Sequence, residues 1–184
     1  YCMAKKALII TWNGYQDQEV VYPYYRLLEE GFDLDLLAED KNQWFYGILG
    51  TKLYANFQAS ELTKEHVKEY DFVLLPGGVK ALEKLRQQKN VLEFISAYVN
   101  ANKVIASTCH GAQLLISAKV TKGRKISGYY SIEDDIVNSG ATYSKDPVVI
   151  DGNVVTSPHY DHMGVWMRTA LAKFRDVNYE EVSQ

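Results

Sequence analysis

A cysteine followed directly by a histidine, Cys109-His110, is the pair of residues in this chain best suited to covalent chemistry. An apolar run at residues 104–106 predicts a buried strand before the pair, and residues 113–116 predict the first turn of a helix after it. Gly111 lies where the two elements must pass closely. Strand, tight turn and helix together are typical of a nucleophile elbow, which lifts one side chain above the carboxyl edge of a sheet. Free N–H groups at the helix start favour negative charge, so we expect the Cys109 thiol to ionise easily, although a lone cysteine in an apolar run is often inert.

Two further features are expected to meet Cys109 over the same edge. Glu19 stands near the start of a helix predicted after the first strand, and Gly77-Gly78 ends another strand. Consecutive glycines let backbone N–H groups approach a ligand, as an oxyanion site requires, and Gly78 is our candidate; a plain turn is the alternative. A carboxylate beside a thiolate would raise the thiol pKa, so we expect Glu19 to keep its proton and to donate a hydrogen bond to sulfur. The alternative for Glu19 is a favourable charge in a helix first turn.

Two histidines are candidates for the general base, and the sequence leaves the choice open. His110 follows the nucleophile, but no nearby acid is fixed to orient it; Glu83, or a carboxylate of a neighbouring subunit, is a candidate for that role. His159, with Asp161 two residues later, follows a predicted strand and combines an imidazole with an acid. His159 and Asp161 are therefore a possible base or substrate contact.

Metal binding is the less favoured interpretation of the same residues. The N and S ligands that zinc prefers are present in Cys109, His110, His159 and His162. The spacing of His159 and His162 alone is a weak signal for a metal site. Zinc would bind the thiolate and block its reaction with a substrate, so we do not expect a metal. We expect no cofactor either. The remaining histidine, His66, lies among charged neighbours and is interpreted as a solvated surface residue.

Composition predicts one domain with a sizeable core. The chain has 184 residues, of which 47% are hydrophobic, and a formal net charge of −3. The chain lacks a long basic cluster, which argues against nucleic acid as a partner. It also lacks a long apolar run and a secretory leader, and we therefore expect a cytoplasmic location away from membranes. Residues 1–2 precede a plausible natural start at Met3, and residues 176–184 form a polar tail.

The elements that must position these residues alternate between strands and helices. Continuous apolar runs predict strands buried on both faces, whereas apolar residues at helical spacing predict helices. Ser131 begins a capping-box pattern, and Asp151-Gly152 predicts a late β-hairpin. The alternation predicts an α/β fold with a parallel sheet and helices on both faces. Strands are expected at 6–11, 32–38, 72–75, 104–106 and 148–156, a weak hairpin within 46–55, and helices at 18–30, 63–69, 81–87, 91–101, 113–118 and 165–174.

Several stretches together resemble the ThiJ/PfpI superfamily, within the class I glutamine amidotransferase-like fold. The most specific is the elbow, residues 107–113, and nearly the whole chain takes part. The PfpI branch is the most similar. The other matching stretches are residues 19–24, 74–78, 123–125, 134–140 and 149–153.

The resemblance implies a flavodoxin-like three-layer sandwich that forms homodimers or larger homo-oligomers. It implies Cys109 as nucleophile, His110 as its neighbour and Glu19 as the acid contacting sulfur, with oxyanion contacts from Gly78 and the His110 amide. In the peptidase branch a glutamate from another subunit orients the histidine, and Glu83 matches it with the spacing shifted by one residue.

One departure from the family pattern concerns the substrate. Where the family continues its late strand with Ser-Arg, this chain has Ser157-Pro158-His159-Tyr160. The arginine is therefore missing, and we expect a different substrate. The residues predict a cysteine-nucleophile enzyme for a small carbonyl or amide, and the resemblance implies that it is either deglycase- or glyoxalase-like or peptidase- or amidase-like. The alternative is a sensor of redox or carbonyl stress, or a chaperone, in which Cys109 is oxidised without turnover.

Overall fold

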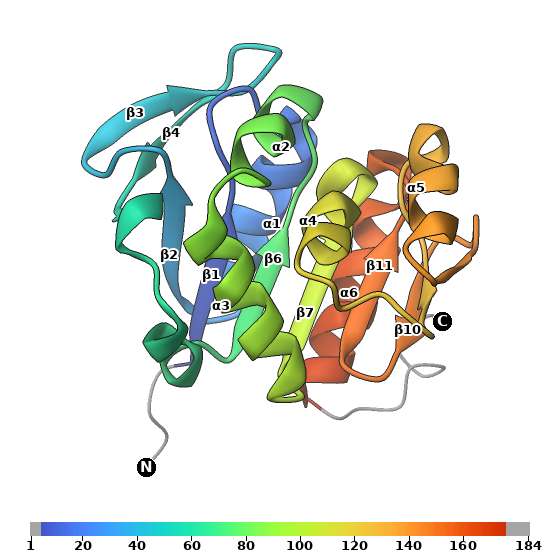
Figure 1. The fold of residues 1–184 in the computed structure, drawn as a ribbon. Coiled ribbons are helices and arrows are strands. Elements are labelled where there is room, and N and C mark those ends of the chain that lie inside the picture. The colour runs from blue at the N-terminus through green and yellow to red at the C-terminus, as the bar shows by residue number, and fades with distance from the viewer. Residues whose placement is uncertain (1–4, 176–184) are drawn as a thin grey trace.

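The computed structural model describes residues 5–175, and a seven-stranded sheet runs through its middle (Figure 1). The strand order is β10-β11-β7-β6-β1-β2-β5, and every neighbouring pair is parallel except the β10–β11 hairpin at one edge. The strands are β1 (Lys6–Ile10), β2 (Asp33–Ala38), β5 (Phe57–Gln58), β6 (Phe72–Leu75), β7 (Val104–Thr108), β10 (Val149–Asp151) and β11 (Val154–Ser157).

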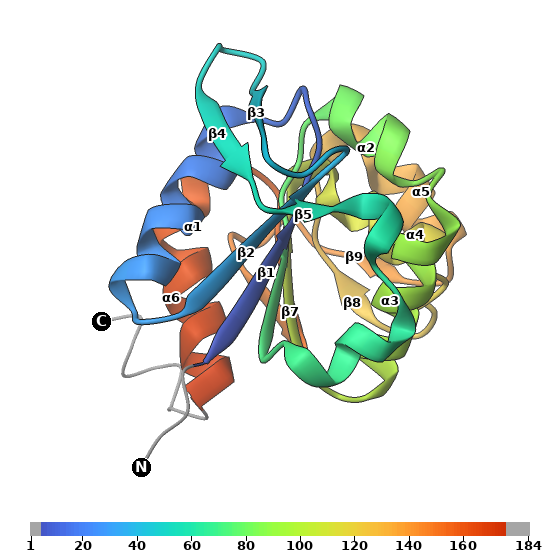
Figure 2. The same ribbon diagram turned by 90° about the vertical axis from the view of Figure 1, so that its left-hand side faces the viewer.

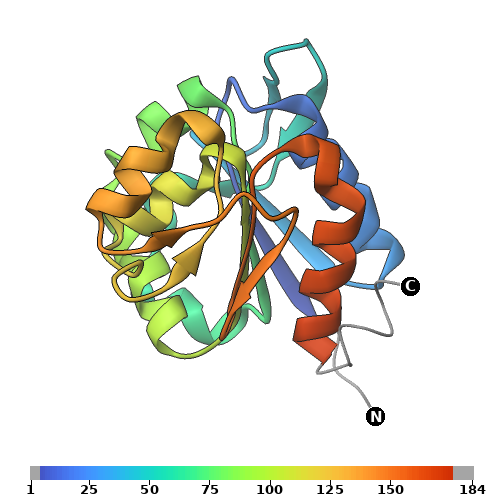
Figure 3. The same cartoon turned by 90° about the vertical axis from the view of Figure 1, so that its right-hand side faces the viewer.

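Helices cover both faces of this sheet, as Figures 2 and 3 show from opposite sides. Helices α1 (Asp17–Glu29) and α6 (Met163–Arg175) lie on one face. The other face carries α2 (Val79–Leu85), α3 (Lys89–Asn100), α4 (Ala112–Ser117) and α5 (Glu133–Asn138). The flavodoxin-like α/β sandwich predicted from the sequence is confirmed.

The central strands are apolar along their whole length because both of their faces are covered. All four residues of β6 are buried, and in β1 every residue after Lys6 is buried. Alternate residues point to opposite faces, so Leu8 packs with the α2–α5 layer and Ile9 packs with α1 and α6. Parallel neighbours bring the carboxyl ends of β1, β6, β7 and β11 to one edge, which is where the candidate residues stand.

Two small sheets extend this frame. The weakly indicated hairpin is present, but its first strand lies earlier than expected: β3 (Gln43–Tyr46) pairs antiparallel with β4 (Lys52–Ala55), and residues 47–51 form the turn. The second small sheet pairs β8 (Lys125–Ile126) with β9 (Thr142–Tyr143). Asp17, at the start of α1, fastens the β3–β4 turn because its carboxylate accepts hydrogen bonds from the amides of Leu49 (2.7 Å) and Thr51 (3.0 Å) and from the Thr51 hydroxyl.

Two local expectations were wrong. Ser131 does not cap a helix, because it lies inside a 3-10 turn, Tyr130–Ile132, and α5 begins after Ile132 without a side-chain cap. His66 is half-buried rather than solvated: its Nδ1 accepts a hydrogen bond from the Thr63 amide at 3.0 Å, and its ring packs edge-on against Phe57. The helix expected at 63–69 is a 3-10 helix, Lys64–Glu69, with Thr63 as its N-cap.

No helix within residues 5–175 is long and apolar enough to cross a membrane. Tyr1, Cys2 and the polar tail at 176–184 lie outside the described residues.

Candidate active site

Cys109 stands on a sharp turn between β7 and α4. The backbone is extended at Thr108, enters the left-handed region at Cys109 with φ of 56°, and passes through the 3-10 turn Cys109–Gly111 into α4. A residue with a side chain in that region costs about 1–3 kcal/mol, which the surrounding structure must supply. The predicted nucleophile elbow is therefore present, with Cys109 at its apex.

Gly111 allows the elbow to fit against β6. A Cβ atom placed on Gly111 would overlap the carbonyl oxygen of Leu75, and this oxygen belongs to rigid backbone. Because the backbone dihedrals of Gly111 are helical, with φ of −56°, the residue is needed for space rather than for conformational freedom. The close approach of β6 and α4 depends on this missing side chain.

Glu19 reaches the same edge from the first turn of α1. Its side chain is fully buried, and its Oε1 accepts a hydrogen bond from the Gly77 amide at 2.8 Å. A Cβ atom on Gly77 would overlap this oxygen and lie 3.0 Å from the Cβ of Cys109, so the carboxyl group and the thiol are neighbours. The other oxygen, Oε2, is buried without a hydrogen-bond partner among the described residues.

Burial sets the charge that Glu19 and Cys109 can hold. Burial raises the pKa of Glu19 from 4.5 to about 7, although the Gly77 hydrogen bond and the interaction with Cys109 act to lower it. Burial also raises the pKa of the Cys109 thiol, and a negative charge on Glu19 raises it further. Burial therefore opposes the easy ionisation expected from position at a helix start. Because both pKa values are raised, the pair holds at most one negative charge near neutrality.

His110 places its imidazole beside the sulfur. Its Nδ1 lies 3.3 Å from the Cys109 Sγ, and its ring stacks on Tyr129 with 4.9 Å between ring centroids and 26° between planes. Burial lowers the pKa of His110, which favours the neutral imidazole that can accept a proton. The sulfur and a neutral base are thus in contact.

These residues open into a cavity of about 290 Å³. It contains Cys109 and His110 together with residues from five other parts of the chain. Its lining residues are Gln16, Ile48, Gly78, Val79, Cys109, His110, Tyr129, His159 and Tyr160. Gly78, the N-cap of α2, has φ of 114°, and a Cβ there would lie 2.7 Å from the Gln16 amide nitrogen, so the turn that brings its backbone to the cavity requires glycine.

Tyr129 is a cavity residue that sequence reasoning missed. Its ring touches His110, and its backbone N–H donates to the carbonyl oxygen of Cys109 at 3.0 Å. The polar loop that carries Tyr129 has no periodic pattern, so no sequence signal linked it to a cysteine twenty residues earlier. Gly128, immediately before it, is the nearest hint, because a Cβ there would lie 3.3 Å from the Cys109 carbonyl oxygen.

The structure brings most of the candidate residues together, with two exceptions. Cys109, His110, Gly78 and His159 line one cavity, and Glu19 contacts the thiol from behind. Asp161 lies outside the lining, with 71% of its side chain exposed. Glu83 is on the exposed side of α2 and does not line the cavity either. Within one chain, Glu83, the candidate for orienting His110, therefore stands outside the cavity.

The described residues also contain no group of three or more histidine, cysteine, aspartate or glutamate side chains that could hold a metal ion.

Comparison with known proteins identifies the family. A family model described as "DJ-1/PfpI family" matches residues 5–173. Over 163 residues the chain is 36% identical to a protein named "Deglycase PfpI" from Pyrococcus furiosus. This match covers 89% of this chain and 95% of the relative. The chain is also 30% identical over 169 residues to "Putative cysteine protease YraA" from Bacillus subtilis. This match covers 92% of this chain and 98% of the relative.

Solved structures show the same fold. DJ-1 from Schizosaccharomyces pombe superposes with a TM-score of 0.82 at 22% identity, covering 98% of this chain and 97% of that one. The family match, the relatives and the shared fold agree with the resemblance seen in the elbow sequence, and the chain therefore belongs to the DJ-1/PfpI family.

Proposed function

We propose that this protein is a cysteine-nucleophile enzyme that acts on a small carbonyl or amide compound. The observation that carries the proposal is the contact between the Cys109 Sγ and the His110 Nδ1, 3.3 Å apart, in the wall of a cavity of about 290 Å³. The names of the relatives, a deglycase and a putative cysteine protease, agree with such chemistry.

The chemistry follows from the positions of the two side chains. The thiol proton passes to the His110 imidazole while the sulfur attacks the carbonyl carbon, which leaves a negative charge on the carbonyl oxygen. The amides of Gly78 and His110 are our candidate donors to this oxyanion. With an amide substrate, His110 then returns the proton to the leaving nitrogen as the C–N bond breaks, and water hydrolyses the thioester. With an α-oxoaldehyde, the first product is a hemithioacetal.

Glu19 would hold the shared charge of the site. When the thiolate forms, a protonated Glu19 can donate a hydrogen bond from its buried carboxyl group, so that the pair carries one charge instead of two. The raised pKa of Glu19, about 7, supports a carboxyl group that keeps its proton through much of the neutral range.

A turnover screen tests the proposal. The substrates are methylglyoxal, a formamide, an isonitrile and a short peptide amide, each offered to the wild type and to Cys109→Ser. We expect steady-state turnover of at least one substrate by the wild type and loss of it in Cys109→Ser. Turnover that survives in Cys109→Ser would show that another group does the chemistry.

A second candidate function is a redox sensor, and the buried oxygen of Glu19 favours it. Two equivalents of peroxide convert a thiolate to a sulfinate with release of water and leave the sulfur with two polar oxygens. Glu19 Oε2 has no hydrogen-bond partner among the described residues, and when protonated it could donate to such an oxygen. Stoichiometric oxidation of Cys109 without turnover of any substrate would favour this function.

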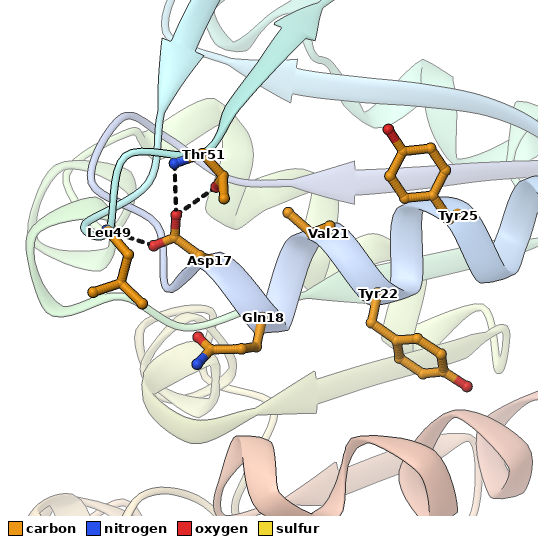
Figure 4. Close-up of a pocket in the computed structure, with 7 residues that line it drawn as sticks. All are labelled: Asp17, Gln18, Val21, Tyr22, Tyr25, Leu49 and Thr51. Atoms are coloured by element: carbon orange, nitrogen blue, oxygen red, sulfur yellow. Dashed lines mark hydrogen bonds between the residues drawn. The ribbon is translucent and has the colours of Figure 1, made fainter.

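We also propose that the chain forms a homo-oligomer. Along α1 and the β3–β4 turn lies a mainly apolar hollow of about 560 Å³, here named the α1 hollow, and Figure 4 shows its residues. Its rim exposes 60% of Tyr25 and 68% of Leu49 to solvent. Exposed apolar surface of this kind favours burial against a second copy. The hollow is lined by Asp17, Gln18, Val21, Tyr22, Tyr25, Leu49 and Thr51.

A further inference from the structure

The second imidazole of the cavity, His159, is held by its surroundings in a way that limits its chemistry. It follows β11, and its ring lies against three tyrosines. Tyr160 is closest, at 3.9 Å between ring centroids, and Tyr129 and Tyr130 stack with it at 6.1 Å and 6.5 Å. These rings fix the plane of the imidazole at the cavity wall.

One nitrogen of this ring is engaged by the backbone. His159 is the N-cap of the 3-10 turn Tyr160–His162, and its Nδ1 accepts a hydrogen bond from the Asp161 amide at 3.1 Å. An amide N–H is always a donor, so the Nδ1 that accepts from it must carry a lone pair. In the neutral ring the hydrogen is then on Nε2, because the bond made by one ring nitrogen determines the state of the other.

The carboxylate of Asp161 favours the opposite tautomer, and the two effects must be compared. Its Oδ2 lies 3.2 Å from the same Nδ1, and a hydrogen on Nδ1 could point to it. That carboxylate is 71% exposed, so water can replace the contact, and exposed ion pairs contribute little. The amide has no such freedom, since its direction is fixed by the turn.

We propose that His159 is a hydrogen-bond donor to a substrate oxygen, acting through Nε2–H, and that it is not the general base. This inference rests on the proposed function of the same cavity. It divides the two histidines by role: His110, in contact with sulfur, moves the proton, while His159 binds and orients the substrate. No described residue accepts a hydrogen bond from Nε2, so this donor remains available to a ligand.

The division of roles also defines the substrate class. Besides the carbon that Cys109 attacks, the substrate carries a neutral oxygen acceptor within reach of His159, as an α-oxoaldehyde or a peptide carbonyl does. Lysine and arginine are absent from the described cavity lining, so an anionic substrate would find no cationic side chain there.

Three variants separate a donor from a base. The probes are methylglyoxal and alanylalaninamide, each of which carries a second carbonyl oxygen besides the group that Cys109 attacks. We expect His159→Phe, which keeps a ring for stacking but has no donor, to lower kcat/KM about 10²-fold. His159→Gln, which keeps an N–H donor but cannot act as a base, should stay within about threefold of the wild type. Asp161→Asn should change kcat/KM by less than about twofold, because the backbone amide fixes the tautomer.

A base role gives the opposite pattern. A histidine base oriented by Asp161 would make His159→Gln as inactive as His159→Phe, and Asp161→Asn would lose about 10⁴-fold. Either result would overturn the proposal. Circular dichroism of each variant checks that the fold is retained.

A measurement without turnover keeps the inference independent of the proposed function. Nitrogen-15 NMR of the histidine rings, assigned with His159→Gln, reports which nitrogen carries hydrogen in the neutral form. We expect an unprotonated Nδ1 and a protonated Nε2 for His159. The reverse tautomer would overturn the proposal even if methylglyoxal is turned over. Conversely, the expected tautomer with no turnover in the wild type would count against the proposed function alone.

Discussion

At the scale of single residues, the account rests on a buried acid and a buried thiol that share one charge. Glu19 and Cys109 come from α1 and from the elbow, and only the fold makes them neighbours. Burial raises both pKa values, so ionisation of either side chain makes ionisation of the other harder. This coupling has a measurable effect on stability as well as on reactivity.

Glu19→Gln should remove a pH-dependent loss of stability. The pKa of Glu19 is about 7 in the folded chain against an ordinary 4.5, so the folded state binds a proton that the unfolded state has released between these values. Wild-type stability should therefore fall by about 3 kcal/mol between pH 4 and pH 8 through this residue. Urea unfolding at several pH values measures it. Glu29→Gln, an exposed glutamate on the same helix, is the control and should keep the wild-type pH dependence.

Reactivity of the thiol gives a second test of the same pair. The pH profile of Cys109 alkylation by iodoacetamide should change in Glu19→Gln, because the variant side chain cannot exchange a proton with sulfur. Alkylation in a Cys2→Ser background isolates the signal. Identical profiles in the presence and absence of Glu19 would mean that the two groups do not share a charge.

The sequence predicted those residues of this site that belong to a recognisable motif or stand at the end of a predicted strand or helix. The elbow motif indicated Cys109, and the positions of Glu19 and Gly78 at strand or helix ends indicated a common edge. Tyr129 was missed because it belongs to an irregular loop. The raised pKa of Cys109 was missed because burial depends on packing by distant segments, which position at a helix start does not reveal.

At the scale of secondary structure, the elbow depends on close packing of β6 against the first turn of α4. Gly111 makes that approach possible because a side chain there would meet the Leu75 carbonyl group. The backbone strain at Cys109 is maintained only while these two elements stay in contact.

Gly111→Ala should therefore destabilise the protein by about 2 kcal/mol or more, since it forces an extra atom into a close-packed interface. Urea unfolding provides the free energy. Gly164→Ala is a matched control, because no atom lies within 4 Å of a Cβ at that position in α6, and it should stabilise by up to about 1 kcal/mol. Equal effects of the two substitutions would contradict the packing role of Gly111.

Strands were predicted correctly where both of their faces are buried. A helix cap was predicted wrongly where contacts with the rest of the chain determine the backbone conformation. β1, β6 and β7 were evident as apolar runs because both of their faces are covered. The capping box at Ser131 was wrong, since the chain there makes a 3-10 turn instead, and local pattern could not distinguish the two. Helix ends were predicted to within about two residues at α1, α2 and α6, which is the usual uncertainty of such boundaries.

At the scale of the whole molecule, the α1 hollow leaves aromatic and aliphatic side chains exposed beside the cavity. Leu49 borders the hollow and its neighbour Ile48 lines the cavity, so a second copy seated on the hollow would also limit the movement of the β3–β4 turn. The site and the surface proposed for assembly are therefore adjacent.

Tyr25→Glu should shift the assembly towards a monomer, because it places a charge on a surface that becomes buried. Sedimentation velocity over a range of concentrations measures the change. Val137→Glu, at an exposed apolar position of α5 on the other face of the sheet, is the control and should leave the assembly intact. A wild-type protein that sediments as a monomer at all concentrations would contradict the proposed homo-oligomer.

The most direct test of the central claim, that Cys109 is the nucleophile, is rapid mixing of the Cys2→Ser protein with alanine p-nitrophenyl ester. We predict a burst of nitrophenol close to one equivalent per chain, and an acyl group found by mass spectrometry on the peptide that contains Cys109. A burst that persists in Cys109→Ala, or turnover with no acyl group on Cys109 at any time, would contradict the account.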